Sequence, residues 1–333
     1  VIAIPSATGD QIRDILSNNK GLDIRFKITP SLASILDGKV AVEQLRELKI
    51  EDLLGRDEVS EMIIDSEENY IRGNVCLVTG GGGSIGSELC RQLLFFSPKT
   101  VIIFDNCEEN VYQIERQLSE QFPDFQVIYE VGDVKDKDDL ENVFKLYQPD
   151  CVFHAAAYKH VPLMEVNVKS LIKNNVLGTH NVLDVSKRFD VDRFILISTD
   201  KAVNPSNVMG ASKRLCELIT LYYAKTSQLN FSVVRFGNVL GSKGSVIPLF
   251  TEQIKKGGPV TVTHPDITRY FMTISEASRL VLQAGMLSTG GEIFTLDMGE
   301  PIKIIDLAKD MIRLAVPDSS DSVQIMFSGL RKG

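Results

Sequence analysis

The sequence predicts an α/β protein with a doubly wound parallel sheet, a smaller C-terminal substrate lobe and a partial α/β segment at the N-terminus. Three observations support this fold class. Short apolar runs recur through the middle of the chain, amphipathic stretches of helical length separate them, and a glycine-rich loop follows the first run. Continuous apolar strands alternating with helices are typical of a parallel sheet that is covered on both faces.

Composition sets the outer bounds. The chain has 333 residues, of which 44% are hydrophobic and 24% charged, an ordinary globular composition with room for about two domains. A net charge of −8 argues against a nucleic-acid partner, because phosphate neutralisation needs a basic face. The five cysteines include no C-x-x-C pair and the four histidines show no metal-ligand spacing, so we expect neither a disulfide framework nor a metal site. No apolar run reaches the roughly 18–20 residues of a membrane span.

The predicted elements follow in order along three regions. Residues 1–73 form a partial α/β segment and linker, residues 74–240 a dinucleotide-binding domain, and residues 241–333 mainly a substrate-binding lobe. Expected strands occupy residues 2–4, 23–28, 75–79, 101–105, 126–129, 151–155, 194–199 and 231–236, expected helices residues 11–17, 88–95, 111–117 and 140–147, and a connecting arm residues 50–56. Both ends look cut, so we expect a fragment of a longer protein, with a packing or linking role for the first segment.

The loop after the expected strand 75–79 predicts that the domain binds a dinucleotide. Gly80, Gly83 and Gly86 have T-G-x-x-G-x-x-G spacing, and Ser84 and Ile85 open the helix. Glycine permits the tight turn and the close approach of a pyrophosphate, whose charge the amides at the helix start favour. Asp105 lies about 20 residues beyond, where a carboxylate can hold the adenosine ribose.

The residues around the second strand end indicate NAD rather than NADP. Asp105 and Asn106 are followed by acidic residues, and no arginine or lysine stands there to hold a 2′-phosphate. Asp133 and Val134, which follow the third strand, are placed to contact the adenine.

Four further motifs follow in order: His-Ala-Ala-Ala at 154–157, Asn-Val-Leu-Gly-Thr at 175–179, Ser-Thr-Asp-Lys at 198–201, and a helix carrying Lys213. With the glycine loop, this series resembles the extended short-chain dehydrogenase/reductase superfamily and, within it, the nucleotide-sugar 4,6-dehydratases. The resemblance implies that Ala155, Ala156, Ala157, Asn175, Ser198 and Lys213 bind the cofactor. It also implies that Thr199 contacts the C4 oxygen of the sugar, that Asp200 is the acid and that Lys201 is the base. An adjacent acid and base suit the removal of the C5 proton and the C6 hydroxyl.

One position departs from the superfamily pattern. Met209 stands where the superfamily has a tyrosine base, and a thioether cannot accept the C4 hydroxyl proton. The sequence leaves Asp200, a water linked to Thr199, and Lys201 as candidate replacements. The same departure resembles a membrane-associated subgroup acting on UDP-N-acetylglucosamine. This implies membrane helices upstream in the full-length protein, a place at the cytoplasmic face of the inner membrane, and a soluble, cytoplasmic fragment here.

Fewer residues in the sequence indicate how the substrate is bound. By resemblance, Asn238 and Arg269 hold the diphosphate. Lys159 follows the strand end on the side where a sugar would lie, and we expect it to contact sugar hydroxyls or phosphate. We also expect Met209 and Ser245, the latter within the run 242–246, to line the sugar pocket. Two alternatives stay open: a nucleotide-sugar 4-epimerase, which has no need of the Asp200-Lys201 pair, and a non-catalytic NAD-binding sensor, suggested by the missing tyrosine. The C5 stereochemistry of the product is also open, with a lean toward retention. Helices flanking such a sheet commonly pair, so we expect a homodimer.

Overall fold

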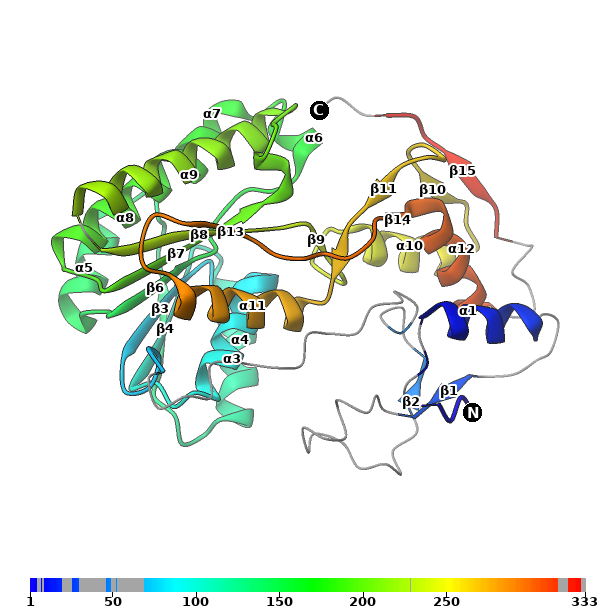
Figure 1. Cartoon of the computed structure of the whole chain (residues 1–333), viewed down its shortest axis with the longest axis horizontal. Coiled ribbons are helices and arrows are strands. Elements are labelled where there is room, and N and C mark those ends of the chain that lie inside the picture. Colours follow the sequence, from blue (N-terminus) through cyan, green and yellow to red (C-terminus); the bar gives the residue numbers. More distant parts are fainter. Residues whose placement is uncertain are drawn as a thin grey trace. The chain divides into compact units, whose positions relative to one another are not determined.

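The computed structural model describes residues 1–4, 7, 9–19, 26–29, 46–48, 52, 69–227, 229–316 and 323–330. The chain forms two compact units (Figure 1). The sheet unit comprises Met62–Gly237 and Ile274–Asp297. The lobe unit comprises Val1–Glu61, Asn238–Thr273 and Met298–Arg331. Residues 274–297, which fall within the range expected for the substrate lobe, thus belong with the sheet.

The sheet unit contains a seven-stranded sheet in the order β13-β8-β7-β6-β3-β4-β5, in which every neighbouring pair is parallel. The strands are β3 (Val75–Thr79), β4 (Thr100–Asp105), β5 (Val127–Val131), β6 (Cys151–His154), β7 (Arg193–Thr199), β8 (Asn230–Phe236) and β13 (Ile293–Thr295). The predicted doubly wound parallel sheet is therefore confirmed. The winding reverses between β3 and β6, so the switch point lies at their carboxyl ends, where ligands of such sheets bind.

Helices cover both faces of this sheet, as Figure 1 shows. The long helices are α3 (Ser84–Leu94), α4 (Glu108–Gln121), α5 (Lys137–Tyr147), α8 (Gly178–Arg188), α9 (Val208–Ser227) and α11 (Ile274–Leu287). Side chains of α5, α8 and α9 share one core with β3, β4, β6, β7 and β8, and α3, α4 and α11 lie on the opposite face. Helix α5 begins earlier than the apolar pattern indicated, because the carboxylate of Asp136 caps it by accepting from the amides of Asp138 and Asp139.

Between β6 and α9 the chain forms short helical elements that border the carboxyl edge of the sheet. They are α6 (Val161–Met164), α7 (Val168–Leu171), the π-helix η3 (Ile172–Leu177) and the 3-10 turn η4 (Asp200–Ala202). A π-helical segment is rare and is found mostly near functional sites. Here it presents Asn174 and Asn175 to the interior.

The lobe unit is built from short paired strands and two amphipathic helices. β9 (Asn238–Val239) pairs with β12 (Phe271–Met272), β10 (Val260–Val262) with β15 (Ile325–Phe327), and β11 (Thr268–Arg269) with β14 (Ile302–Lys303). The apolar faces of α10 (Val246–Lys255) and α12 (Ile304–Ala315) pack over them in one core.

The N-terminal residues have a small core of their own within the lobe unit. Helix α1 (Gly9–Asn18) buries Ile12 against Ile2 and Ile28, with Leu314 of α12 packed beside them. Strand β1 (Lys27–Ile28) pairs with β2 (Arg46–Glu47), and Ile2 bridges to Ile28. Residues 23–25 of the expected strand 23–28, and all of the expected arm 50–56 except Asp52, lie outside the described residues.

No helix in the described ranges is both long enough and apolar enough to cross a membrane. Within the same ranges, no three histidine, cysteine or acidic side chains come together as a metal site would require. All five cysteines are unbridged.

A buried histidine ties the sheet to α8 at the end of β6. His154 is 1% exposed, with Nδ1 2.6 Å from Oγ1 of Thr79 on β3 and Nε2 2.9 Å from Oγ1 of Thr179 on α8. Burial, assisted by the nearby positive charge of Lys213, lowers the pKa of His154 to about 3. The imidazole is therefore neutral in the folded protein.

Replacing His154 with asparagine should reduce the acid sensitivity of folding. The imidazole titrates near 6.5 in an unfolded chain, so below that pH the unfolded state binds the proton first and the folded state loses stability. Between pH 7.5 and pH 5.5 this effect amounts to about 1.4 kcal/mol. Urea unfolding at both pH values should show a fall in stability smaller by that amount in His154→Asn than in the unsubstituted protein. Equal falls in the two proteins would contradict the assignment.

Candidate active site

The glycine loop joins β3 to α3 and packs directly against the end of β6. Gly80 has a φ of +67°, and a Cβ there would lie 2.7 Å from the amide nitrogen of Ala156. A Cβ on Gly86 would lie 2.1 Å from the carbonyl oxygen of Gly80. Since real Cβ atoms do not approach backbone so closely, both positions require glycine. The predicted tight turn and close packing are thus features of the structure.

Asp105 ends β4 and is almost completely buried, with its carboxylate held by two backbone amides. Oδ2 accepts from the amide of Gly82 at 3.0 Å, and Oδ1 accepts from the amide of Cys107 at 2.9 Å. These bonds lock the side chain between the glycine loop and the start of α4. A carboxylate has further acceptor sites, so Asp105 can still receive hydrogen bonds from ribose hydroxyls.

A cleft of about 190 Å³ opens beside this carboxylate, at the switch point of the sheet. Nine of the residues predicted to bind the cofactor line it: Gly80, Gly83, Asp105, Asn106, Asp133, Val134, Ala155, Ala156 and Ala157. Five others were not predicted: Phe104, Asn110, Gly132, Tyr158 and Asn174. Tyr158 directly continues the alanine run and Asn174 directly precedes Asn175, so adjacency to the motifs was the available signal. The lining fits the adenosine half of a dinucleotide.

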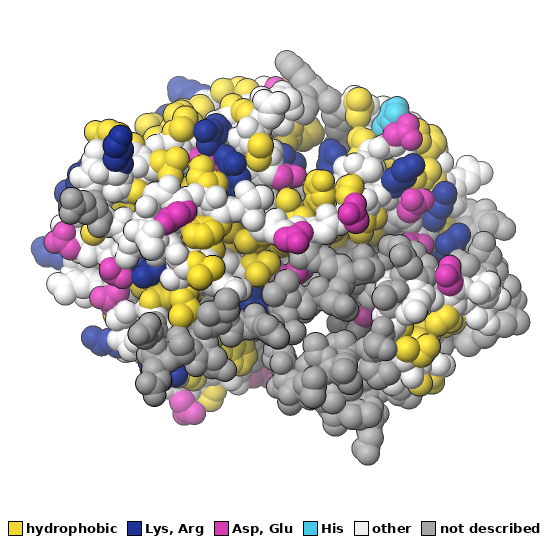
Figure 2. All heavy atoms as spheres, viewed as in Figure 1, with side chains coloured by type: hydrophobic (Ala, Val, Ile, Leu, Met, Phe, Trp, Pro, Cys, Tyr) yellow, Lys and Arg dark blue, Asp and Glu magenta, His cyan; other side chains and the backbone are white. Residues whose placement is uncertain are grey.

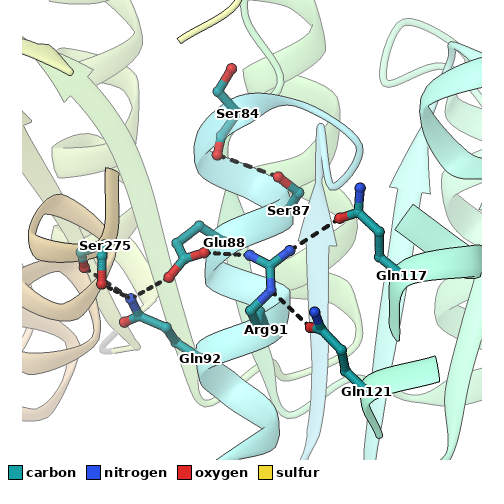
Figure 3. A network of polar contacts seen from close by, with 8 residues as sticks. All are labelled: Ser84, Ser87, Glu88, Arg91, Gln92, Gln117, Gln121 and Ser275. Carbon is teal, nitrogen blue, oxygen red and sulfur yellow. Dashed lines mark hydrogen bonds and ion pairs between the residues drawn. The ribbon is translucent and has the colours of Figure 1, made fainter. Parts of the chain in front are cut away.

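Helix α3, which follows the glycine loop, is fixed by polar contacts along its length (Figure 3). Arg91 donates to Gln117 at 3.1 Å and to Gln121 at 3.2 Å, both on α4. Gln92 donates to the carbonyl oxygen of Ser275, at the start of α11, at 2.9 Å. The predicted residues Ser84 and Ile85 form the first turn of α3, and the start of a helix favours a phosphate.

Asn175 has a different position from that expected of a cofactor ligand. Its side chain is buried (1% exposed), accepts from the amide of Tyr158 at 2.8 Å and donates to the carbonyl oxygen of Tyr158 at 3.0 Å. It also donates to Oγ of Ser212 on α9 at 3.1 Å. Asn175 therefore clamps the segment that lines the cleft, while its neighbour Asn174 lines the cleft itself.

The predicted acid and base lie where β7 ends. Thr199 donates to Oδ1 of Asp200 at 2.8 Å, and Nζ of Lys201 lies 3.0 Å from the same oxygen. Both charged side chains are about a quarter exposed. Because both contacts use Oδ1, the carboxylate is held in one orientation while Oδ2 takes part in neither contact.

Helix α9 approaches this turn closely. A Cβ on Gly210 would lie 2.3 Å from the carbonyl oxygen of Lys201, so only glycine permits the contact. Met209 is buried in an apolar cluster with Tyr158, Val161, Met164, Leu171 and Val208. Lys213, one turn further along the helix, is 5% exposed, and its burial lowers the pKa of its amine.

The substrate residues are divided between the units. Lys159 follows the alanine run in the sheet unit, and desolvation lowers the pKa of its amine. Asn238 on β9, Ser245 before α10 and Arg269 on β11 belong to the lobe unit. Arg269 is exposed there, and its guanidinium donates to the carbonyl oxygen of Thr268 at 2.8 Å.

The cleft, the glycine loop and the strand-end residues define a dinucleotide-binding protein with the extended short-chain dehydrogenase/reductase fold. The sequence matches the family described as "Polysaccharide biosynthesis protein" over residues 76–333. It is also 49% identical over 336 residues to the probable polysaccharide biosynthesis protein EpsC of Bacillus subtilis, a match that covers 100% of this chain and 56% of EpsC. The chain belongs to this family and spans little more than half the length of that relative.

Solved structures of other proteins share the fold. Pen of Bacillus thuringiensis superposes with a TM-score of 0.75 at 32% identity, covering 79% of this chain and 81% of Pen. DesIV of Streptomyces venezuelae, a dTDP-glucose 4,6-dehydratase solved with NAD bound, superposes with a TM-score of 0.66 at 24% identity, covering 78% and 87%. At that identity the second comparison supports the fold alone.

Gly86→Ala should disrupt the loop and weaken dinucleotide binding at least about tenfold, because the added methyl group displaces the Gly80 carbonyl from the turn that cradles the phosphates. Titration with NAD, followed by fluorescence or calorimetry, measures the effect. Ser87→Ala is the matched control on the same helix, because it removes only a 3.4 Å contact with the carbonyl oxygen of Ser84. Equal NAD affinity in Gly86→Ala and the control would contradict the role of the loop.

Proposed function

We propose that this chain is the catalytic part of an NAD-dependent UDP-N-acetylglucosamine 4,6-dehydratase, a hydro-lyase that forms UDP-2-acetamido-2,6-dideoxy-4-keto-hexose. The observation that carries the proposal is the Asp200-Lys201 pair, oriented by Thr199 where β7 ends. An epimerase needs no such pair at C5 and C6. Family membership supports a nucleotide-sugar enzyme in general.

NAD, when bound, takes a hydride from C4 of the sugar and returns it to C6. The chain's own residues supply the binding site for it. The loop amides and the first turn of α3 suit the pyrophosphate, and Asp105 suits the adenosine ribose. Lys213 is proposed to hold the nicotinamide ribose, and the small side chains of Ala155, Ala156 and Ala157 leave room for the dinucleotide across the sheet edge.

Asp200 is the best candidate for the base that replaces the missing tyrosine. Its Oδ1 is engaged by Thr199 and Lys201, which leaves Oδ2 to accept the C4 hydroxyl proton. The same carboxyl then donates that proton to the C6 oxygen, which leaves as water. The neutral amine of Lys201 takes the C5 proton, exchanges protons with solvent, and later protonates C5 again. The sugar thereby loses one water with no net oxidation.

An anionic substrate needs only local cations on a chain with a net charge of −8. Arg269 and Asn238 are proposed to bind the diphosphate, for which a guanidinium is suited by its paired donors. Lys159 and Ser245 are proposed to line the sugar pocket, whereas Met209, which was also expected there, is buried in its apolar cluster.

On the resemblance to PglF, the dehydratase of bacillosamine synthesis, we propose that the reaction supplies modified sugars for glycosylation and that the configuration at C5 is retained. We propose that the chain works at the cytoplasmic face of the inner membrane as part of a longer, membrane-associated protein.

Incubation with UDP-N-acetylglucosamine and NAD, followed by mass spectrometry, tests the proposal. The expected product is lighter by one water, and in D₂O it should carry deuterium at C5. Asp200→Asn and Lys201→Met should each lower the rate about 100-fold or more, the usual size of an acid–base contribution. Lys137→Met and Asp184→Asn are matched controls that break a 2.8 Å ion pair between α5 and α8, and both should keep the wild-type rate.

Other outcomes identify the alternatives. A product of unchanged mass with an altered sugar indicates a 4-epimerase, which shares the fold and the first hydride step. No product from any UDP-hexose, with NAD still bound, indicates a sensor. Either result would overturn the dehydratase assignment.

The surface of α9 supports the proposed homodimer. Besides its buried side, this helix exposes Leu215 (42%), Leu218 (47%) and Tyr222 (65%). Hydrophobic side chains among charged ones are visible over the sheet unit in Figure 2. A helix with apolar residues on both sides is usually covered on both sides, and a second copy of the chain would cover this one.

Leu218→Glu/Tyr222→Glu should dissociate the dimer, because each copy would bury two carboxylates at the α9 interface. Light scattering after gel filtration should give twice the chain mass of 36.9 kDa for the wild type and 36.9 kDa for the variant. Tyr112→Glu on α4, at a residue that is 56% exposed, is the control and should stay dimeric. A wild-type chain that runs as a monomer would refute the interface.

A further inference from the structure

A fully buried carboxylate lies behind the catalytic strand end. Glu217, in the middle of α9, has 0% exposure. Its Oε1 accepts from Oγ of Ser198 at 2.6 Å and from Nε of Arg235 at 2.7 Å, while Oε2 accepts from Nη2 of Arg235 at 2.5 Å and from Nη1 of Arg214 at 2.9 Å. Burial raises the pKa of Glu217, but these donors outweigh it and hold the pKa below its ordinary value.

The partners of Glu217 come from three different elements. Ser198 is the residue before Thr199 on β7, and Arg235 is its register partner on β8. Glu217 itself lies one helical turn beyond Lys213 on α9. One carboxylate thus joins the strand that carries the acid–base pair to the helix that carries Met209 and Lys213. The hydroxyl of Ser198, a predicted cofactor ligand, donates to this carboxylate.

Stability alone is a weak reason for such an arrangement. Apolar side chains of similar size often replace a buried ion cluster with no loss of stability, because desolvation of the charges cancels much of their attraction. Directional hydrogen bonds, in contrast, fix relative position to within a fraction of an ångström, and apolar packing does so less strictly. Reaction rates are sensitive to displacements of that size.

We infer that Glu217 is a positioning residue for the acid–base pair: through Ser198 and Arg235 it fixes the end of β7 relative to α9. The inference rests on the proposed function. Glu217 itself touches neither substrate nor reacting atoms, and it acts through Ser198 on Thr199, Asp200 and Lys201.

Two variants test this role. Glu217→Met/Arg235→Met removes both charges, leaving no buried ion unpaired, because the Arg214 side chain is 37% exposed and can remain hydrated. Ser198→Ala removes only the link to β7 and keeps the ion pairs. The control, Glu141→Met/Arg188→Met, removes an ion pair between α5 and α8 that does not touch β7.

The measurements are the melting temperature, and kcat and KM for water loss from UDP-N-acetylglucosamine. In the double variant we expect a melting temperature near that of the wild type, a fall in kcat of about tenfold or more, and a KM changed less than about threefold. Ser198→Ala should also lower kcat with little change in KM, but to a smaller degree. The control should keep the wild-type kcat and KM. A purely structural role would lower the melting temperature and leave the kcat of the folded fraction unchanged.

A folded double variant with wild-type kcat would overturn the inference. If the double variant does not fold, Ser198→Ala serves as the test instead. A wild-type kcat in Ser198→Ala would also overturn the inference. If the wild type itself releases no water, the proposed function fails and the role of Glu217 falls with it. If the wild type releases water and the variants keep its kcat, the inference about Glu217 is wrong and the proposed function stands.

Discussion

The active site depends on three places where backbone approaches backbone too closely for a side chain. Gly86 lies against the carbonyl of Gly80, Gly80 against the amide of Ala156, and Gly210 against the carbonyl of Lys201. The contacts of Gly86 and Gly80 hold the glycine loop against the end of β6, and the contact of Gly210 holds α9 against the turn after β7. Because hard-sphere contacts admit no gradual adjustment, they set the distances between the cofactor cleft and the acid–base pair.

Buried polar side chains fix the positions of the strands and helices that these glycine contacts bring together. His154 joins β3, β6 and α8, Asn175 holds Tyr158 and reaches α9, and Glu217 joins β7, β8 and α9. The first two do this without charge, which limits the cost of burial to satisfying their hydrogen bonds. Glu217 is ionised, so it depends on the two arginines that pair with it.

The strands and the cofactor loop could be predicted from the sequence because each depends on residues that are neighbours in the chain. Continuous apolar runs such as 75–79 and 101–105 admit few other structures, and the glycine spacing follows from the turn that it forms. The environment of Ser198 and Asn175 could not be read this way. Their polar atoms engage Glu217 and the backbone of Tyr158, partners that only the folded chain brings near. Strand β13 was missed because its three residues carry too little pattern.

Met209 shows how packing restricts the chemistry. The side chain is 3% exposed among Tyr158, Met164 and Leu171, so the position suits an apolar residue. Met164, Leu171, Val161 and Val208 are apolar, and a hydroxyl buried among them would need a hydrogen-bond partner. A methionine at this position therefore fits its neighbours on α6, α7 and α9 without a hydrogen-bond partner. In the proposed reaction, acid–base work at C4 falls to groups outside this cluster, and Thr199, Asp200 and Lys201 lie on the turn against which α9 begins.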